Sequence, residues 1–221
     1  MLKNVLIAED HESTSLSVRK TLADAGITST DYVFYCDDAL ARIQKRLTEE
    51  EPYDLLITDL YFEEDECKQK LATGADLIKA AKQIQPDLKV LVFSAETKAA
   101  VIESLFDDLN IDGYVRKARH DAQELRFAFE NIARNRRHYP PHLRQLVRQK
   151  NSYDFTEFDI TIISLLSQGM LQKDIPEYLQ QNKIKPCGLS SVEKHLNKMK
   201  EVLDFTKNEQ LVAFCKDMGI I

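Results

Sequence analysis

The sequence has no apolar run long enough to cross a membrane. A transmembrane helix needs about 20 consecutive apolar residues, and 30% of these 221 residues are charged. The opening segment MLKNVLIAED holds only a short apolar run that ends in acidic residues. A secretory signal needs a longer apolar region and a small-residue cleavage site. We therefore expect a strand here, and a cytoplasmic protein that has no membrane partner.

Cysteine is scarce and unpaired in the sequence. The four cysteines are widely separated and form no C-x-x-C pair; they are Cys36, Cys67, Cys187 and Cys215. A zinc site or a disulfide framework needs closer and more regular spacing. We expect reduced thiols, which are usual in the cytoplasm.

Arginine is absent from residues 151–221, and charge is unevenly distributed along the chain. Residues 1–130 hold 16 basic against 26 acidic residues, residues 131–150 hold six against none, and residues 151–221 hold eight against ten. Segments of different charge indicate parts with different roles. We predict a first domain at 1–130, a basic helix extension and linker at 131–152 that breaks at Pro140-Pro141, and a second domain at 153–221.

Short apolar runs alternate with helical patterns in the first 130 residues. We expect strands at 4–8, 32–36, 54–58, 89–93 and 112–117, and helices near 14–25, 38–49, 75–84, 97–109 and 121–137. Runs that are apolar throughout fit strands covered on both faces. Five β-α units in succession predict an α/β fold with a doubly wound parallel sheet.

Charged and hydroxyl side chains follow four of these strands. Glu9 and Asp10 follow the first strand, Asp59 the third, Ser94 the fourth and Lys117 the fifth. The carboxyl ends of parallel strands meet at one edge of a sheet, so these side chains should converge. Three crowded carboxylates repel one another unless a cation neutralises them. Oxygen ligands suit Mg²⁺, so we expect Asp59 to be partnered by a divalent ion and Lys117.

The Glu9-Asp10 pair, the Asp59 of LLITDL, the Ser94 of VLVFSAE and the Lys117 of GYVRK closely resemble the receiver domain of bacterial two-component response regulators. The resemblance covers about residues 3–130. It implies the flavodoxin-like (βα)5 sheet and phosphorylation of Asp59 by a sensor histidine kinase or a small phosphodonor. The receiver's slow loss of its own phosphoryl group is not turnover of a substrate, so we expect no enzyme.

The same resemblance implies a role for each residue at the site. Glu9, Asp10 and Asp59 would hold Mg²⁺ together with the backbone carbonyl of Tyr61. The remaining residues would respond to the phosphoryl group: Ser94 would hydrogen-bond it, Lys117 would pair with it, and Tyr114 would be an aromatic switch that turns inward when Ser94 moves. Their movement can bias a two-state surface.

The stretch YFEEDECKQKLATG, residues 61–74, is longer and more acidic than the corresponding turn of the family. One interpretation is a solvated loop, because like charges repel one another and stay in water. The other is an acidic lid near Asp59 that alters metal affinity, phosphodonor access or phosphoryl lifetime. The sequence leaves both open.

Residues 153–221 have an all-helical pattern, with helices expected at 155–170, 171–181, 190–203 and 207–219. This four-helix domain resembles the LuxR-type helix-turn-helix of NarL/FixJ-class regulators, through Thr156-x-x-Asp159, the stretch 167–175 and the stretch 191–195. The resemblance implies that helix 190–203 enters the major groove and that the phosphorylated homodimer reads a two-fold site in double-stranded DNA. Our candidate DNA contacts are Lys173, Ser191, Lys194, Asn197 and Lys198.

Two departures from the LuxR pattern keep an alternative open. The turn at 180–190 is longer than in the family, and the domain lacks arginine, the usual reader of guanine. The second domain could therefore be a protein-interaction or dimerisation module without DNA binding. A phosphohydrolase of the haloacid dehalogenase type is less favoured, because its motif has a second Asp two residues after the nucleophile, where this sequence has Tyr61.

Overall fold

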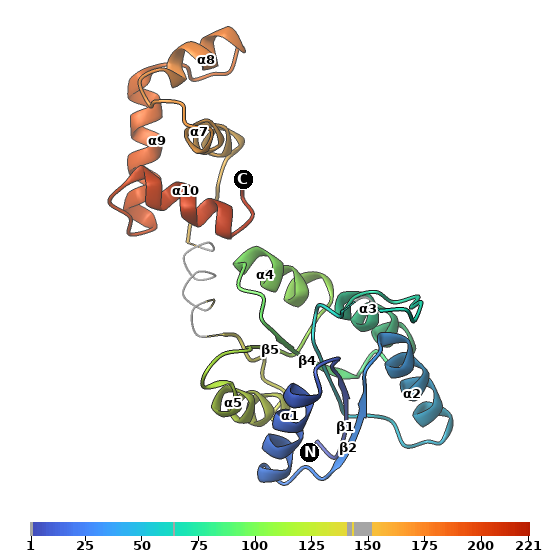
Figure 1. The fold of residues 1–221 in the computed structure, drawn as a ribbon. Helices are drawn as coiled ribbons and strands as arrows, with labels where there is room; N and C mark the ends of the chain where they lie inside the picture. Colours follow the sequence, from blue (N-terminus) through green and yellow to red (C-terminus); the bar gives the residue numbers. More distant parts are fainter. Residues whose placement is uncertain (1, 64, 141–142, 144–151) are drawn as a thin grey trace. The chain divides into compact units, whose positions relative to one another are not determined.

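The computed structural model describes residues 2–63, 65–140, 143 and 152–221. The described chain forms two compact units (Figure 1). The first holds residues 1–97 and 101–140, and the helices from residue 157 onward belong to the second. Within the described residues, no helix has the combination of length and apolar character that a membrane span requires.

The first unit contains a five-stranded sheet in which all neighbouring strands are parallel, in the order β2-β1-β3-β4-β5. The strands are β1 (Asn4–Ala8), β2 (Ser29–Val33), β3 (Leu55–Thr58), β4 (Lys89–Ser94) and β5 (Gly113–Arg116). The strand order reverses between β1 and β3, and in such folds this is where the site forms, at the carboxyl ends. The predicted fold class is confirmed for this unit.

Helices cover both faces of this sheet. They are α1 (Glu12–Asp24), α2 (Cys36–Thr48), α3 (Gly74–Ile84), α4 (Ala99–Asp108) and α5 (Asp121–Ala133). Helices α1 and α5 pack together on one face, and α2 and α3 pack together on the other (Figure 1). The core under α1 and α5 alternates along the strands, with Ile7, Ile57 and Phe93 buried against Leu22 and Phe129.

Strand β2 begins and ends three residues earlier than predicted. It runs along residues 29–33, not 32–36, and it is an edge strand whose side chains are mostly half-buried or exposed. An edge strand tolerates polar residues such as those of STDYV. The apolar run after Val33 belongs instead to the turn into α2, which begins at the buried Cys36.

Helix α5 is shorter than predicted, so the expected basic helix extension is wrong for residues 134–137. The helix ends at Ala133, and Asn135 has a left-handed backbone (φ 56°), which stops a helix. The chain then returns to the sheet, where the Tyr114 amide donates to the His138 carbonyl at 3.0 Å. Residues 141–142 and 144–151 of the predicted linker lie outside the described residues.

The second unit is all-helical. Its helices are α7 (Glu157–Ser167), α8 (Ile175–Gln181), α9 (Leu189–Val202) and α10 (Asn208–Asp217). Helix α7 starts with a capping box in which Thr156 and Asp159 bond each other's backbone amides. Each helix buries one apolar face, as Val192, Leu196 and Met199 do on α9. This matches the all-α domain expected from the spacing of apolar residues.

Candidate functional site

The carboxyl edge of the sheet brings Glu9, Asp59 and Lys117 together. Glu9 follows β1, Asp59 follows β3 and Lys117 follows β5. The Lys117 ammonium lies 2.8 Å from Glu9 Oε2 and 2.5 Å from Asp59 Oδ2. The two acidic residues are only 2% and 7% exposed. Burying unpaired carboxylates would be costly, so the ammonium is what allows both to lie at this edge.

One ammonium does not fully balance these carboxylates. Burial raises the pKa of Glu9, and the charge of Asp59 raises it further, although Lys117 acts against both effects. Burial alone would lower the pKa of Lys117, but its hydrogen bonds to Asp59 and Glu9 outweigh burial and raise it. The edge therefore carries more negative charge than its own cation neutralises, a condition that favours a further cation.

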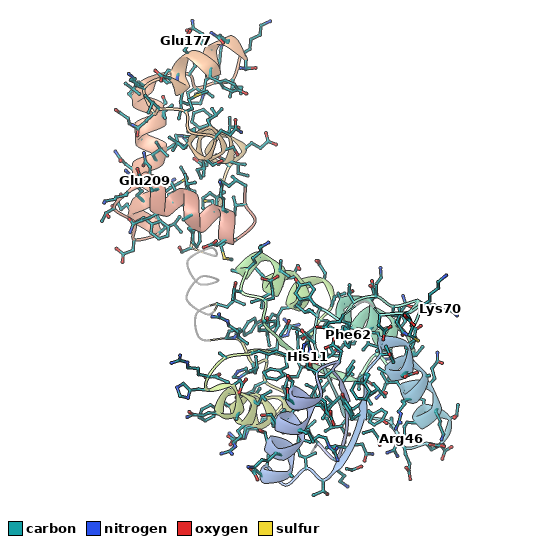
Figure 2. All side chains as sticks on the ribbon, in the orientation of Figure 1. His11, Arg46, Phe62, Lys70, Glu177 and Glu209 are labelled. Atoms are coloured by element: carbon teal, nitrogen blue, oxygen red, sulfur yellow. The ribbon has the colours of Figure 1, made fainter. Side chains whose placement is uncertain are left out.

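Asp10 lies beside this cluster with each of its oxygens engaged. Its Oδ1 is 2.8 Å from His11 Nδ1, and its Oδ2 accepts the backbone N–H of Glu63 at 2.7 Å. Burial would raise the pKa of Asp10, but the hydrogen bonds from Glu63 and His11 lower it. Figure 2 labels His11 at the end of β1 and Phe62 in the loop that carries Glu63. Asp10 is thus held as an ionised, oriented carboxylate.

The Asp59 carboxylate is also oriented by its own chain. Its Oδ1 accepts the backbone N–H of Leu60 at 2.6 Å and lies 3.4 Å from that of Tyr61. Gly74 packs directly on this turn, and a Cβ added at Gly74 would come within 1.8 Å of the Asp59 carbonyl oxygen. The sequence marks Gly74 only as the start of a helix. Its close approach to Asp59 depends on how the 61–73 loop folds back.

Ser94 and Tyr114 lie at the ends of β4 and β5. Ser94 is fully buried, and its hydroxyl has no hydrogen-bond partner among the described residues. A buried hydroxyl without a partner is costly, and such a group is often completed by a ligand. Tyr114 is buried, and its hydroxyl donates to the Glu96 carbonyl at 2.8 Å. The ring is therefore already inward here, which is one of the two positions expected for a switch.

The donor set of this edge fits Mg²⁺. Glu9, Asp10 and His11 each offer a ligand atom, and these atoms all lie within 4.8 Å of one another. Carboxylate oxygens are the ligands that Mg²⁺ prefers in proteins. Tyr61 follows Asp59 and pairs with Thr73 in an isolated bridge. Among the described residues, the group of Glu9, Asp10 and His11 does not include Asp59, so Asp59 and the backbone carbonyl of Tyr61 as metal ligands stay predictions.

The predicted DNA contacts lie on the second unit. Lys194, Asn197 and Lys198 are exposed on α9, Ser191 is half-buried on the same helix, and Lys173 is exposed just before α8. Four of the five therefore share one helix, at spacings that place Lys194, Asn197 and Lys198 on one face.

Helices α7 and α9 are joined by a contact between a buried carboxylate and a half-buried histidine that the sequence did not reveal. Asp159 at the start of α7 is fully buried, and its Oδ1 is 2.6 Å from His195 Nδ1 on α9. The His195 ring also packs edge-on against Phe158, with centroids 4.8 Å apart. The pattern Thr156-x-x-Asp159 signalled the helix start, but nothing in it signalled the contact with a residue 36 positions away.

Three comparisons with known proteins agree with this arrangement. The chain is 25% identical over 184 residues to the transcriptional regulatory protein RcsB of Escherichia coli K12, which covers 81% of each chain. A structure of two RcsB dimers bound to two parallel DNAs matches 98% of this chain and 99% of that chain, with 21% identity and a TM-score of 0.58. The isolated REC domain of RcsB from Salmonella enterica serovar Typhimurium, with the phosphomimetic BeF3⁻, matches 66% of this chain and 98% of that chain, with 24% identity and a TM-score of 0.53.

The family comparison covers the unit that contains Glu9, Asp59 and Lys117. The model of the response regulator receiver domain matches residues 5–130, more than half of the chain. Apart from Asn4 at the start of β1, these residues include all five strands, and they include the edge at which the acidic residues and Lys117 meet. The chain belongs to the response regulator receiver domain family.

Proposed function

We propose that the protein is a transcription-regulating response regulator, phosphorylated on Asp59 in a Mg²⁺-dependent reaction. The observation that carries this proposal is the shared ammonium of Lys117 between Glu9 and Asp59, next to the unpartnered hydroxyl of Ser94. A purely structural ion pair would not require a neighbouring buried hydroxyl that lacks a hydrogen-bond partner. Perturbed, incompletely satisfied groups of this kind are typical of functional sites.

The geometry suits phosphoryl transfer, which needs positioning and charge neutralisation more than covalent chemistry from the protein. The amide of Leu60 holds Asp59 Oδ1, so an oxygen of Asp59 can attack the phosphorus of a phosphohistidine or small phosphodonor. The bond from phosphorus to the donor breaks, and the donor leaves with its electron pair. Bound Mg²⁺ would offset the negative charge of the incoming group beside the carboxylates.

The chain's own residues then hold the product, an acyl phosphate on Asp59. Lys117 already contacts Asp59 Oδ2, so its ammonium can move to the new phosphoryl oxygens. Ser94 can donate its free hydroxyl to the same group, and each charge-assisted hydrogen bond of this kind is strong. Tyr114 contacts the backbone at Ser94 and Glu96, so movement of Ser94 would reach this ring.

The second unit is proposed as a DNA-binding output domain that acts as a homodimer on a two-fold site. The RcsB structure described above is of dimers bound to DNA, and its fold extends over nearly the whole chain. Helix α9 would enter the major groove with Lys194, Asn197 and Lys198, while Ser191 and Lys173 contact the flanking backbone. The phosphoryl group would come from a sensor histidine kinase or a small phosphodonor, and the protein would act in the cytoplasm.

Labelling with a small acyl phosphate in the presence of Mg²⁺ tests the acceptor. Asp59→Asn should abolish incorporation of the phosphoryl group, because the amide is not a nucleophilic carboxylate. Asp87→Asn is the matched control, since Asp87 is exposed and lies outside the site, and it should label as the wild type does. Labelling that survives in Asp59→Asn would exclude Asp59 as the acceptor.

One observation favours the alternative of a protein-interaction module. The region 151–221 has two more acidic than basic residues and no arginine, whereas DNA affinity comes largely from basic contacts to phosphate. Selection from random duplex DNA, with and without the phosphodonor, separates the two functions. Enrichment of a two-fold sequence by the phosphorylated protein supports DNA binding, and no binding at low salt supports the interaction module.

A further inference from the structure

The long acidic loop between β3 and α3 is held against neighbouring elements of the first unit by polar contacts. Its base is closed by the antiparallel bridge between Tyr61 and Thr73. Near the end of the loop, the backbone amides of Lys70 and Leu71 donate to the two carboxylate oxygens of Asp37 at 2.8 and 3.0 Å. Of these residues, Figure 2 labels Lys70. Asp37 belongs to the first turn of α2, so the loop is anchored to a rigid helix.

The same loop contacts the metal-binding edge at its other end. The Glu63 amide donates to Asp10 Oδ2 at 2.7 Å. Between these anchors, the Tyr35 hydroxyl donates to Asp65 Oδ2 at 2.6 Å. The loop is therefore held both at α2 and at Asp10, although most of its described side chains are exposed to solvent. Both interpretations of the loop, a solvated loop and an acidic lid, stay predictions.

Polar contacts hold this loop at several points, and its apolar residues Phe62 and Leu71 are only half-buried. A cavity of about 430 Å³ lies against it, lined by Asp10, Phe34 and Phe62 among others. The loop residues Glu63, Asp65 and Lys70 are exposed. With little buried apolar surface to hold it, the loop should move when an anchor is removed.

We propose that Asp37 is a positioning residue for the metal site, acting through this loop on Asp10. Asp37 fixes the amides of Lys70 and Leu71, the fixed loop presents the Glu63 amide, and that amide orients the Asp10 carboxylate toward the metal. Hydrogen bonds to a ligating carboxylate typically change metal affinity 10- to 100-fold when they are lost. This inference rests on the proposed function, because it requires that Asp10 binds Mg²⁺.

Asp38 offers a matched control for the charge of Asp37. Both carboxylates lie in the first turn of α2, where acidic side chains favour the helix dipole. Only Asp37 accepts amides from the loop in the contacts described above. A comparison of the two alanine variants therefore separates loop positioning from a general electrostatic or helix-stabilising effect.

The experiment is a calorimetric titration of the full chain with MgCl₂ alone, with circular dichroism as a check on folding. Asp37→Ala should weaken Mg²⁺ binding about tenfold, and Asp38→Ala should bind as the wild type does. Asp37→Asn keeps one acceptor oxygen and should recover part of the affinity. Tyr35→Phe, which removes a milder anchor, should weaken binding only a few-fold.

A spectroscopic measurement follows the positioning itself. In ¹H–¹⁵N spectra of the metal-free protein, the Glu63 amide proton should shift upfield and exchange faster with solvent in Asp37→Ala, but not in Asp38→Ala. Equal Mg²⁺ affinity in Asp37→Ala and the wild type would overturn the positioning role and leave the proposed function standing. Equal losses in Asp37→Ala and Asp38→Ala would also overturn it. Absence of binding by the wild type would instead overturn the proposed metal site.

Discussion

Each unit of this protein contains a buried carboxylate paired with a basic side chain, but the two pairs are completed differently. In the second unit, Asp159 Oδ1 contacts His195, while Oδ2 contacts the Thr156 hydroxyl at 2.7 Å, its amide at 3.0 Å and the Tyr153 hydroxyl at 3.2 Å. In the first unit, Asp59 shares Lys117 with Glu9.

The difference lies in what remains unsatisfied. Asp59 and Asp159 each have protein partners on both carboxylate oxygens. Asp59, however, shares its ammonium with Glu9, whereas Asp159 is the only carboxylate that contacts His195 among the described residues. We call Asp159 and His195 the saturated pair, because such a fully satisfied network makes the local structure rigid. The edge around Asp59 carries surplus negative charge and the free hydroxyl of Ser94. A saturated pair holds helices together, whereas a cluster with surplus negative charge and a free hydroxyl suits a ligand that supplies a positive charge and a hydrogen bond.

The largest effect on stability should come from breaking the saturated pair. Asp159→Ala removes a fully buried carboxylate that accepts from Thr156 and contacts the half-buried His195, so we expect a loss of about 2 kcal/mol from these charge-assisted hydrogen bonds. Urea unfolding followed by circular dichroism measures this loss. Asp59→Asn is the comparison, because Lys117 keeps Glu9 as a partner and the repulsion between two crowded carboxylates is relieved; it should cost at most about 1 kcal/mol, as for one lost hydrogen bond. Equal losses would remove the distinction between the two pairs.

The pH dependence of stability tests the same pair. Burial would raise the pKa of Asp159, but its hydrogen bonds with Thr156 and His195 lower it below the ordinary value of 3.8. A lowered folded-state pKa contributes stability above 3.8, and this contribution is lost as pH falls through the folded-state pKa. The difference in unfolding free energy between the wild type and Asp159→Asn should be constant near neutral pH and shrink in acid. A difference that persists unchanged in strong acid would contradict this.

The hydroxyl groups of Thr156 and Ser94 test the same comparison between the two units, with smaller expected effects on stability. Thr156 caps α7 and bonds Asp159, so Thr156→Ala should cost about 1 kcal/mol. Ser94 has no hydroxyl partner in the described structure, so Ser94→Ala should leave stability almost unchanged, since no hydrogen bond is lost. Thermal unfolding of both variants checks this. A clear destabilisation by Ser94→Ala would show that the hydroxyl already has a structural partner.

The smallest effect concerns the surface of the second unit. Lys173→Ala should weaken DNA binding a few-fold and reduce the slope of log affinity against log salt by about one. Lys216→Ala, an exposed lysine on α10, should change neither. Fluorescence anisotropy at several salt concentrations measures both variants. An unchanged slope in Lys173→Ala would remove this residue from the DNA-contacting surface.

The sheet and the residues at its edge could be predicted because parallel strands end on the same side. Glu9 and Asp59 follow strands with clear apolar runs, and Lys117 follows the shorter run Tyr114-Val115, so their meeting could be predicted from the direction of parallel strands. Strand β2 was misplaced because an edge strand is half-exposed and its polar residues give a weaker signal than the apolar residues that follow it. The end of α5 was misplaced because no local pattern announces the left-handed Asn135.

The contacts that position functional residues could not be predicted in the same way. The contact of Asp37 with Lys70 and Leu71 spans more than 30 residues, and so does that of Asp159 with His195. Neither pair lies at a repeating spacing, and each depends on how a whole loop or helix is placed. The sequence left the role of the acidic loop open, and the structure shows hydrogen bonds that hold Glu63, Asp65, Lys70 and Leu71 to the neighbouring elements.

The order of apolar and charged residues by itself determined the parallel sheet, the chemistry of its edge and the all-helical character of the second unit, because hydrophobic period and strand direction are local properties. Only the tertiary structure decided which polar groups are completed by the protein and which are left for a ligand. Whether a polar group finds a hydrogen-bond partner depends on donor–acceptor distances that must be correct to a few tenths of an ångström. The residues concerned are far apart in the chain, and no spacing in the sequence encodes these distances.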